Sequence, residues 1–392
     1  MICHLCRGLV VWDGKGVDVA GFSGIGWRTR LVLVALGVAC LLGVSIPIAL
    51  GGDSTPTWKL KSYYSRGTDR SFKCDLYQEM PRVPRVLVYG GSRSLRMDPA
   101  TIKRKTGLVS FNFGFHNGRP EDAWAVTDWV LDSHPDKPPA VIWCVQATTL
   151  ADVPMNPGLI VDKRLSQSFP KALIDAKMHW AMKQPKRNIL SGRRYGYDGM
   201  LWWNGYDTKR KQGLTLQRAL DGYLDADMLA RAGNGLLPHH TRAMAYFVQT
   251  IRLLNKNHIK PLIVIMPYHP RALSAFLSVG WGVKETWLRT YLSKLSEHLD
   301  FKVLNCLNIS TFGGTPDGFY DGAHLNAVNS RRLIRYCIAH APSCFKLPPP
   351  PKPTPSPSPS PSASGSPEPS LVPAPAYTPV PEDTSVPADF LE

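Results

Sequence analysis

The chain is long enough for a large hydrophobic core, with 392 residues of which 44% are hydrophobic. Its 46 Lys and Arg against 30 Asp and Glu give a formal net charge of +16, which favours polyanions as partners. The sequence contains no helix-turn-helix, zinc-finger or RNA-binding signature, so nucleic acid is not the expected polyanion. Eight cysteines are too dispersed to indicate a disulfide-dense scaffold.

Residues 31–52 are expected to anchor the chain in a membrane. The run 31–50 ("LVLVALGVACLLGVSIPIAL") is uncharged and about as long as a helix that crosses a bilayer. A cleaved secretory signal has a shorter apolar region of roughly 7–15 residues, so an uncleaved signal anchor is favoured. Arg28 and Arg30 precede the run and place residues 1–30 in the cytoplasm. We therefore expect a single-pass protein of the cell membrane, with the bulk of the chain extracytoplasmic.

The anchor and a low-complexity tail leave one stretch for a folded domain. Residues 53–80 are interpreted as a juxtamembrane linker. Residues 347–392 are dominated by Pro and Ser ("PPPPKPTPSPSPSPSAS"), lack the apolar residues to fold, and are expected to be disordered. This tail has one Lys against five acidic residues, so the positive charge belongs to the rest of the chain. Residues 81–346 are expected to form the domain.

The cysteines and histidines do not indicate a metal centre. Cys3 and Cys6 form a C-x-x-C, but a second pair that would complete a zinc site is missing. A cluster of carboxylates or histidines with ligand spacing is not evident either, so neither a metal nor another cofactor is expected. Cys337 and Cys344 flank the end of the last expected helix, and the sequence leaves open whether they form a disulfide bridge.

Short apolar runs bounded by turn residues alternate with helix-like stretches, as in a buried parallel sheet. The runs lie at 86–89, 108–113, 140–147, 260–268 and 301–306, and the helix-like stretches at 121–134, 241–258, 284–299 and 329–341. This alternation predicts right-handed crossovers and a mostly parallel sheet with helices on both faces. The expected fold class is a three-layer α/β/α sandwich, preceded by one transmembrane helix.

Residues 151–240 interrupt this rhythm. They are rich in Trp, Gly and Arg ("GRRYGYDGMLWWNGYD") and lack a long periodic stretch. A long irregular insertion in an α/β domain is more often functional than accidental. We expect a lid or substrate wall, whose aromatic residues stack on sugar rings, rest on a membrane surface or fill a small core of their own.

Reactive side chains follow the ends of the expected strands, where ligands bind in open α/β sheets. Ser92 follows the first strand, and Asp321 and His324 follow the last. His324 can take the proton of the Ser92 hydroxyl, while Asp321 orients the imidazole and stabilises its cation. These three residues are the candidate catalytic set for acyl transfer.

Glycine and amide groups follow the middle strands and can stabilise the oxyanion of such a reaction. The backbone N–H groups of Ser92 and Gly114 are the first candidates, and the side-chain amides of Asn117 and Gln146 are the second. Arg93, beside the serine, either neutralises an anionic substrate or is simply solvated, and we expect the latter.

The order of these residues resembles the SGNH/GDSL hydrolase superfamily. There the nucleophile follows strand one in a Gly-Asp-Ser block, and a D-x-x-H pair precedes the last helix. Here the blocks read Gly90-Gly91-Ser92 and Asp321-Gly322-Ala323-His324, with Gly114 as the glycine block, over about residues 84–340. The chain looks most like membrane-anchored envelope members, such as those of teichoic acid D-alanylation and alginate O-acetylation. This resemblance implies a flavodoxin-like sheet and a carbohydrate esterase or O-acyltransferase acting on a cell-envelope polysaccharide, supplied by a membrane acyl-donor protein.

The chain departs from the family pattern at two places. Gly91 replaces the aspartate before the serine, which does not affect the mechanism. The third block, a Gly-x-Asn-Asp whose asparagine completes the oxyanion hole, is absent, and "CVQATTL" with Gln146 stands in its place. The G-x-S-x-G elbow of α/β-hydrolases occurs nowhere in the sequence, which disfavours that fold.

A non-catalytic role remains open at this point. Gly-Gly-Ser after a strand is a common turn, Asp321 is equally suited to a turn or a helix cap, and His324 to a partly buried position. The missing asparagine and the Pro-rich tail favour an SGNH-like envelope protein that binds or presents an anionic polymer. The complete set of Ser92, Asp321 and His324 favours the enzyme.

Overall fold

The computed structural model describes residues 69–347 with gaps, together with two short antiparallel strands, β1 (Val11–Trp12) and β2 (Val17–Asp18). The gaps are 152, 172, 175–193, 204–208, 211, 234–236 and 239–240. The expected anchor at 31–52 and nearly all of the tail at 347–392 lie outside the described residues. Within the described ranges, no helix is both long and apolar enough to cross a membrane.

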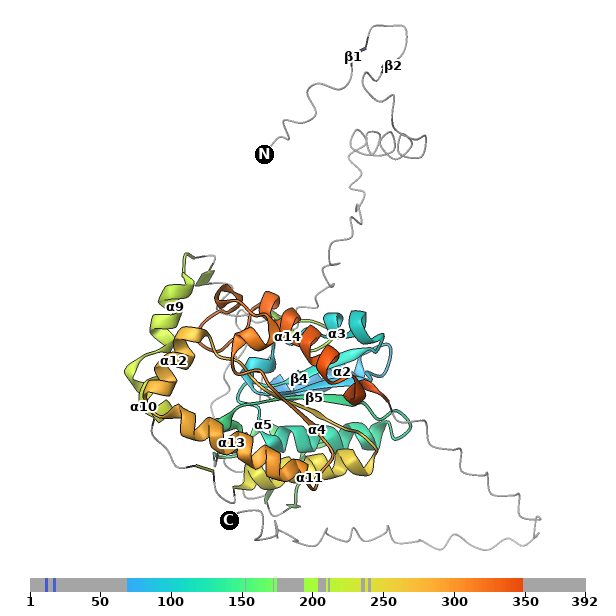
Figure 1. The fold of residues 1–392 in the computed structure, drawn as a ribbon. Helices are drawn as coiled ribbons and strands as arrows, with labels where there is room; N and C mark the ends of the chain where they lie inside the picture. Colours follow the sequence, from blue (N-terminus) through green and yellow to red (C-terminus); the bar gives the residue numbers. More distant parts are fainter. Residues whose placement is uncertain are drawn as a thin grey trace, which may run out of the picture. The chain divides into compact units, whose positions relative to one another are not determined.

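A five-stranded sheet forms the centre of the domain (Figure 1). All neighbouring strands pair parallel, in the order β4-β3-β5-β8-β9. The strands are β3 (Val86–Gly90), β4 (Ser110–Gly114), β5 (Ala140–Val145), β8 (Leu262–Ile265) and β9 (Lys302–Asn305). All five expected strands are confirmed, with their ends shifted by a few residues.

Side chains of β3, β5 and β8 alternate between two buried cores, one on each face of the sheet. In β3, Leu87 and Tyr89 belong to one core, while Val86 and Val88 belong to the other. The Leu87 face is covered by α4 (Pro120–Ser133), α11 (Arg242–Lys256) and α13 (Trp281–Ser296), and the opposite face by α3 (Pro99–Thr106) and α14 (Ala327–His340) (Figure 1). This arrangement confirms a three-layer α/β fold with a parallel sheet.

Helix α3 is too short and has too few apolar residues to be predicted from apolar periodicity. It is eight residues long, and Ile102 is its one buried large apolar side chain. Its ends are defined instead by caps: Asp98 accepts a hydrogen bond from the backbone N–H of Ala100 at 2.9 Å, and Gly107 ends the helix with φ 75°. Helix α12 (Pro270–Ser278) was likewise not predicted, although His269 caps it and Pro270 occupies its first turn.

Helix α2 (Asp69–Gln78) lies in the stretch interpreted as a linker, and that interpretation is wrong for this segment. Phe72 and Tyr77 are buried in the core on the Leu87 face. The sequence does not look amphipathic, because Arg70 and Lys73 on the same helix are buried as well. The domain therefore begins no later than α2, rather than at residue 81.

The insertion at 151–240 contains more regular structure than expected. Its described elements are α5 (Gly158–Val161), α6 (Lys163–Ser166), β6 (Arg194–Tyr195), β7 (Leu201–Trp203), α9 (Leu216–Tyr223) and α10 (Ala226–Gly233). Tyr195 and Leu201 are buried in the main core, and the Tyr195 ring packs edge-on against Phe72. Tyr195 thus belongs to the core of the domain itself, whereas the sequence predicts at most a small separate core for the aromatic residues of the insertion.

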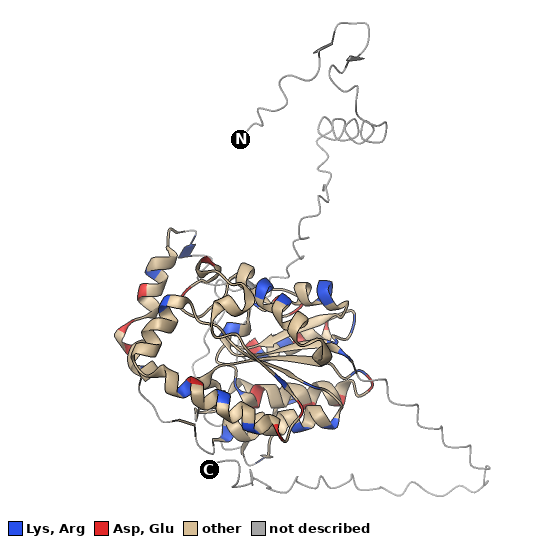
Figure 2. Ribbon diagram, viewed as in Figure 1, with Lys and Arg blue, Asp and Glu red and all other residues tan. Residues whose placement is uncertain are grey.

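Charged side chains of both signs are distributed along the helices of the domain (Figure 2). Basic residues gather in the last turn of α3, at Lys103, Arg104 and Lys105.

Cys337 and Cys344 are free, buried thiols, so the disulfide bridge that the sequence left open is not formed.

Lys73 is fully buried beneath the end of β4. Its ammonium group donates hydrogen bonds to the carbonyl oxygens of Asn112, at 2.9 Å, and Gly114. Burial lowers the pKa of Lys73 from its ordinary 10.5 to about 7, although the carboxylates of Asp69 and Asp198 act in the opposite direction. The folded chain therefore releases this proton far more readily than the unfolded chain does.

A Lys73→Met variant tests this burial. Between pH 7 and 10.5, Lys73 is protonated in the unfolded chain but not in the folded chain. The contribution of Lys73 to the free energy of unfolding therefore increases as the pH rises through this window and is lost as the pH falls through it. The free energy of unfolding, from urea titrations at several pH values, should rise less steeply with pH in the variant. Tyr and Cys side chains titrate in both proteins and cancel in the comparison. Equal slopes would contradict the prediction.

Candidate active site

A pocket of about 560 Å³ opens at the carboxyl ends of β3 and β5, where the strand order changes direction. Residues that follow four of the strands line it: Ser92 and Arg93 after β3, Asn117 and Gly118 after β4, Gln146 after β5 and Met266 after β8. Ala151 and residues 153–157 add another side. The start of the insertion therefore forms a wall of this pocket.

Ser92, His324 and Asp321 form a continuous hydrogen-bonded chain. Nε2 of His324 lies 2.9 Å from Oγ of Ser92, and Nδ1 lies 2.8 Å from Oδ2 of Asp321. Asp321 is fully buried, whereas 27% of the His324 side chain is exposed. The imidazole is thus held by a buried carboxylate on one side and meets the serine hydroxyl on the other, as nucleophilic catalysis by serine requires.

The turn that carries Asp321 and His324 is fixed by the same carboxylate. Oδ1 of Asp321 accepts the backbone N–H groups of Ala323 and His324, each at 2.8 Å. Asp321 does not cap the last helix, because Asn326 is the N-cap of α14 and accepts the N–H of Val328 at 2.9 Å. Asp321 therefore stabilises the turn with one carboxylate oxygen and contacts the His324 imidazole with the other.

Gly322 is required between them by close packing. A Cβ atom at this position would overlap the Tyr223 ring of α9 and lie 3.0 Å from Cβ of Ala272. The Gly322 carbonyl also accepts the backbone N–H of His269 at 3.0 Å. Helices α9 and α12 therefore press on the turn and hold it in place.

Ser92 reaches the pocket through a tight turn after β3. Gly90 has φ 139°, a conformation that side chains rarely adopt, and a Cβ atom there would lie 2.7 Å from the carbonyl oxygen of Cys144. Ser92 then opens a short 3-10 turn, Ser92–Ser94, in which Oγ of Ser94 donates to the carbonyl oxygen of Gly91 at 2.7 Å. The glycines thus release the chain from the sheet and leave Ser92 at its edge.

Gly114 does not have the role expected for it. Its N–H donates to Oδ1 of Asn112 at 2.7 Å and so is already used. The Asn112 amide in turn donates to the carbonyl oxygens of Ser94 and Met97, each at 2.8 Å. The expectation that Gly114 provides an oxyanion donor is therefore wrong, because its N–H is already bonded to Asn112. Gly114 instead allows close packing, since a Cβ atom there would overlap Oγ of Ser94.

Asn117 and Gly118, further along the same loop, line the pocket instead. Asn117 is exposed and has φ 52°, in the left-handed region. Gly118 packs so closely on β3 that a Cβ atom would overlap the carbonyl oxygen of Gly90. The structure thus brings the Asn117 side chain to the pocket that Ser92 lines, as expected for a candidate amide donor.

Gln146 also lines the pocket, and its amide orientation is fixed from both ends. Nη1 of Arg93 donates to Oε1 at 2.6 Å, while Nε2 donates to Oγ1 of Thr148 at 2.9 Å. One N–H bond of Nε2 is used in this way, which leaves the other for a ligand.

Arg93 is buried, so the expectation that it is solvated is wrong. Its Nη2 donates to the carbonyl oxygens of Met266, at 2.9 Å, and Pro267, and its guanidinium stacks 3.9 Å from the Tyr268 ring centre. Apart from the position of Arg93 beside Ser92, nothing in the sequence indicates this role. Arg93 connects the ends of β3, β5 and β8.

Nothing in the sequence singles out Arg119, the other arginine that lines the pocket. Its guanidinium donates to the carbonyl oxygen of Thr148 at 2.9 Å and to that of Ala151, so it ties the loop after β4 to the loop after β5.

Among the described residues, no group of three or more His, Cys, Asp or Glu side chains lies together as metal ligands would.

A double-mutant cycle tests the packing at Gly322. Gly322→Ala should lower the melting temperature, because the new Cβ atom displaces either the turn or the Tyr223 ring. In a Tyr223→Ala background, where the ring is gone, the same substitution should cost much less. Thermal unfolding of the four proteins measures the coupling, and additive shifts would show that the two residues do not collide.

Known protein sequences and structures say little about this chain. No protein-family model and no curated protein sequence matches the chain. One solved structure, described as a "putative acylhydrolase" from Bacteroides fragilis NCTC 9343, is similar with a TM-score of 0.34 and 11% identity, over 71% of this chain and 95% of that one. A likeness at this level carries no argument, so the proposed function depends on the site itself.

Proposed function

We propose that the chain is a serine esterase or O-acyltransferase of the SGNH type. The observation that carries the proposal is the unbroken contact from Asp321 through His324 to Ser92, beside a pocket large enough for a small acyl ester. Ser92 is the proposed nucleophile, His324 the general base and acid, and Asp321 the residue that orients the imidazole.

In the first half of the reaction, Oγ of Ser92 attacks the carbonyl carbon of the ester as its proton passes to Nε2 of His324. The buried carboxylate of Asp321 stabilises the imidazolium that forms. The tetrahedral intermediate then collapses, the bond to the leaving alkoxide breaks, and His324 returns the proton to that oxygen. The product is an acyl-serine and a free alcohol.

In the second half, a water molecule or an acceptor hydroxyl attacks the acyl-serine. His324 removes the proton of this nucleophile and returns it to Oγ of Ser92 when the acyl bond breaks. Water gives an esterase and a sugar hydroxyl gives an O-acyltransferase, so the two activities share the same residues and differ in the acceptor that the pocket admits.

The oxyanion needs donors near Ser92. The proposed donors are the backbone N–H of Ser92, the side-chain amide of Asn117 and the second N–H of Gln146 Nε2. Arg93 holds Oε1 of Gln146 and so keeps the amide nitrogen, rather than the oxygen, available. Gln146 thereby replaces the asparagine of the third family block.

The composition of the pocket supports an anionic or polar substrate. Arg93 and Arg119 both line it, and the described residues that line it include no Asp or Glu. With the net charge of +16, this agrees with the proposal that the substrate is an anionic cell-envelope glycopolymer. Anchoring by residues 31–52, an extracytoplasmic location and a membrane acyl-donor protein as partner belong to the same proposal.

Ser92→Ala tests the nucleophile. The variant should lose a serine-reactive phosphonate label at this site and lower kcat for a chromogenic acetyl ester by about 10³-fold or more, because the acyl-serine cannot form. Ser296→Ala, at the exposed end of α13, is the matched control and should behave as wild type. Label or turnover that persists in Ser92→Ala would reject Ser92. A wild type with neither property would favour the non-catalytic protein that binds an anionic polymer.

Gln146→Glu tests the amide donor. Glutamate keeps an acceptor for Arg93 but presents a carboxylate where Nε2 stood, so the oxyanion meets a negative charge. We expect kcat to fall by roughly 10²–10³-fold with a much smaller change in KM, since the lost bond forms mainly in the transition state. Steady-state kinetics at one pH measures both constants, and a change confined to KM would assign Gln146 to ground-state binding.

A further inference from the structure

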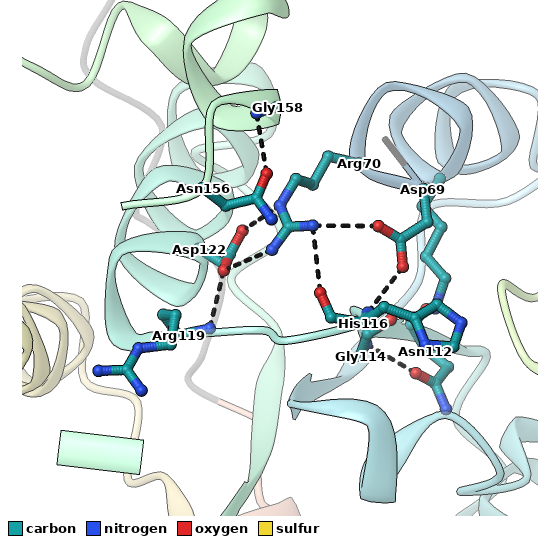
Figure 3. Close-up of polar contacts among 10 residues, drawn as sticks. Asp69, Arg70, Asn112, Gly114, His116, Arg119, Asp122, Asn156 and Gly158 are labelled. Atoms are coloured by element: carbon teal, nitrogen blue, oxygen red, sulfur yellow. Dashed lines mark hydrogen bonds and ion pairs between the residues drawn. The ribbon is translucent and has the colours of Figure 1, made fainter. Parts of the chain in front are cut away.

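Helix α2 meets the loop after β4 in a cluster of buried charges (Figure 3). Nε and Nη2 of Arg70 donate to the two carboxylate oxygens of Asp122 at 2.6 and 3.0 Å, and Nη1 donates to Oδ1 of Asp69 at 3.1 Å. All three side chains are buried, with Arg70 only 1% exposed. Charged hydrogen bonds removed from water in this way are strong and directional.

The cluster holds the backbone of the loop at both of its ends. Oδ2 of Asp69 accepts the N–H of His116 at 2.7 Å, and Nη1 of Arg70 donates to the carbonyl oxygen of His116 at 3.3 Å. At the other end, Oδ2 of Asp122 accepts the N–H of Arg119 at 2.7 Å. Figure 3 shows these contacts converging on the Arg70 guanidinium and its two carboxylates.

Asn117 and Gly118 lie between these two ends, and both line the pocket with Ser92. Asparagine tolerates the left-handed conformation that Asn117 adopts, so contacts from outside the loop have to fix its position. The backbone of Gly90 presses on Gly118 from the side of the sheet. The charge cluster provides the opposing restraint, because it fixes the neighbours of both residues.

We propose that Arg70 is a positioning residue for acyl transfer, which holds Asn117 at the oxyanion site beside Ser92. This inference rests on the proposed function. Arg70 itself contacts no reacting atom and acts through the backbone of His116 and through Asp122. Replacing a buried ion pair by apolar residues is often neutral or stabilising. The presence of the charge cluster is therefore better explained by the loop geometry that it imposes than by a gain in stability.

Arg70→Lys in the full chain keeps the positive charge but loses the planar fork that spans two carboxylates. We expect kcat for the acetyl ester to fall on the order of 10²-fold with KM nearly unchanged, as for a misplaced catalytic group. The matched control is Arg164→Lys, which alters an arginine paired with Asp162 at 2.6 Å and should leave both constants as in the wild type.

Two variants of Asp69 separate positioning from folding. Asp69→Asn keeps an oxygen that can accept the His116 N–H, whereas Asp69→Ala does not, so kcat per phosphonate-titrated site should stay near wild type in the first and fall in the second. A purely structural role would lower the melting temperature and the fraction of titratable sites without this difference in kcat. Equal kcat in the two variants would overturn the proposal.

Hydrogen–deuterium exchange gives a readout that does not depend on catalysis. Amides of residues 115–119 should exchange faster in Arg70→Lys than in the wild type and Arg164→Lys, because the loop has lost its restraint. Unchanged exchange would overturn the positioning role, whatever the activity. If the wild type neither turns over the ester nor labels at Ser92, the proposed function fails, and the exchange result still decides whether Arg70 positions the loop.

Discussion

The place of β3 inside the parallel sheet is the constraint on which the rest of the domain depends. It pairs in register with β4 and β5, so that Gly90 is level with both Gly114 and Cys144. Three segments that are far apart in the sequence therefore leave the sheet together at one edge. Strand β9 ends at the same edge, and the turn of Asp321 and His324 follows it. The pocket is thus a consequence of strand order, and the loops refine it.

The sheet could be predicted because buried parallel strands are short continuous apolar runs between turn residues. Long helices such as α11 were predicted from their periodicity for a similar reason. Helix α2 could not be recognised in this way, because the side it buries carries Asp69, Arg70 and Lys73 as well as apolar residues. Their burial is possible only through partners elsewhere in the chain, such as Asp122 and the Asn112 carbonyl oxygen. The sequence of the helix alone does not indicate that such partners exist.

The candidate site likewise has one part that could be predicted from the sequence and one part that could not. Asp321 and His324 are neighbours in one turn, and Ser92 follows a recognisable strand, so their convergence could be inferred from topology. The oxyanion side could not, because the availability of the Gly114 N–H depends on whether the Asn112 side chain turns back to accept it. The burial of Arg93 is equally invisible, since it depends on carbonyl oxygens that follow β8, far along the chain.

Steric and electrostatic restraints act on opposite sides of the loop that carries Asn117. The backbone of Gly90 prevents Gly118 from moving toward β3, while the carboxylate of Asp69 prevents His116 from moving away. Apolar packing alone would not do this, because the hydrophobic effect has no direction and cannot fix where a backbone N–H points. A buried network of charged hydrogen bonds adds little net stability but does fix such directions. This network lies on one side of Ser92, and the turn held by Asp321 lies on the other. The proposed acyl transfer would need fixed geometry on both sides of the carbonyl group that Ser92 attacks.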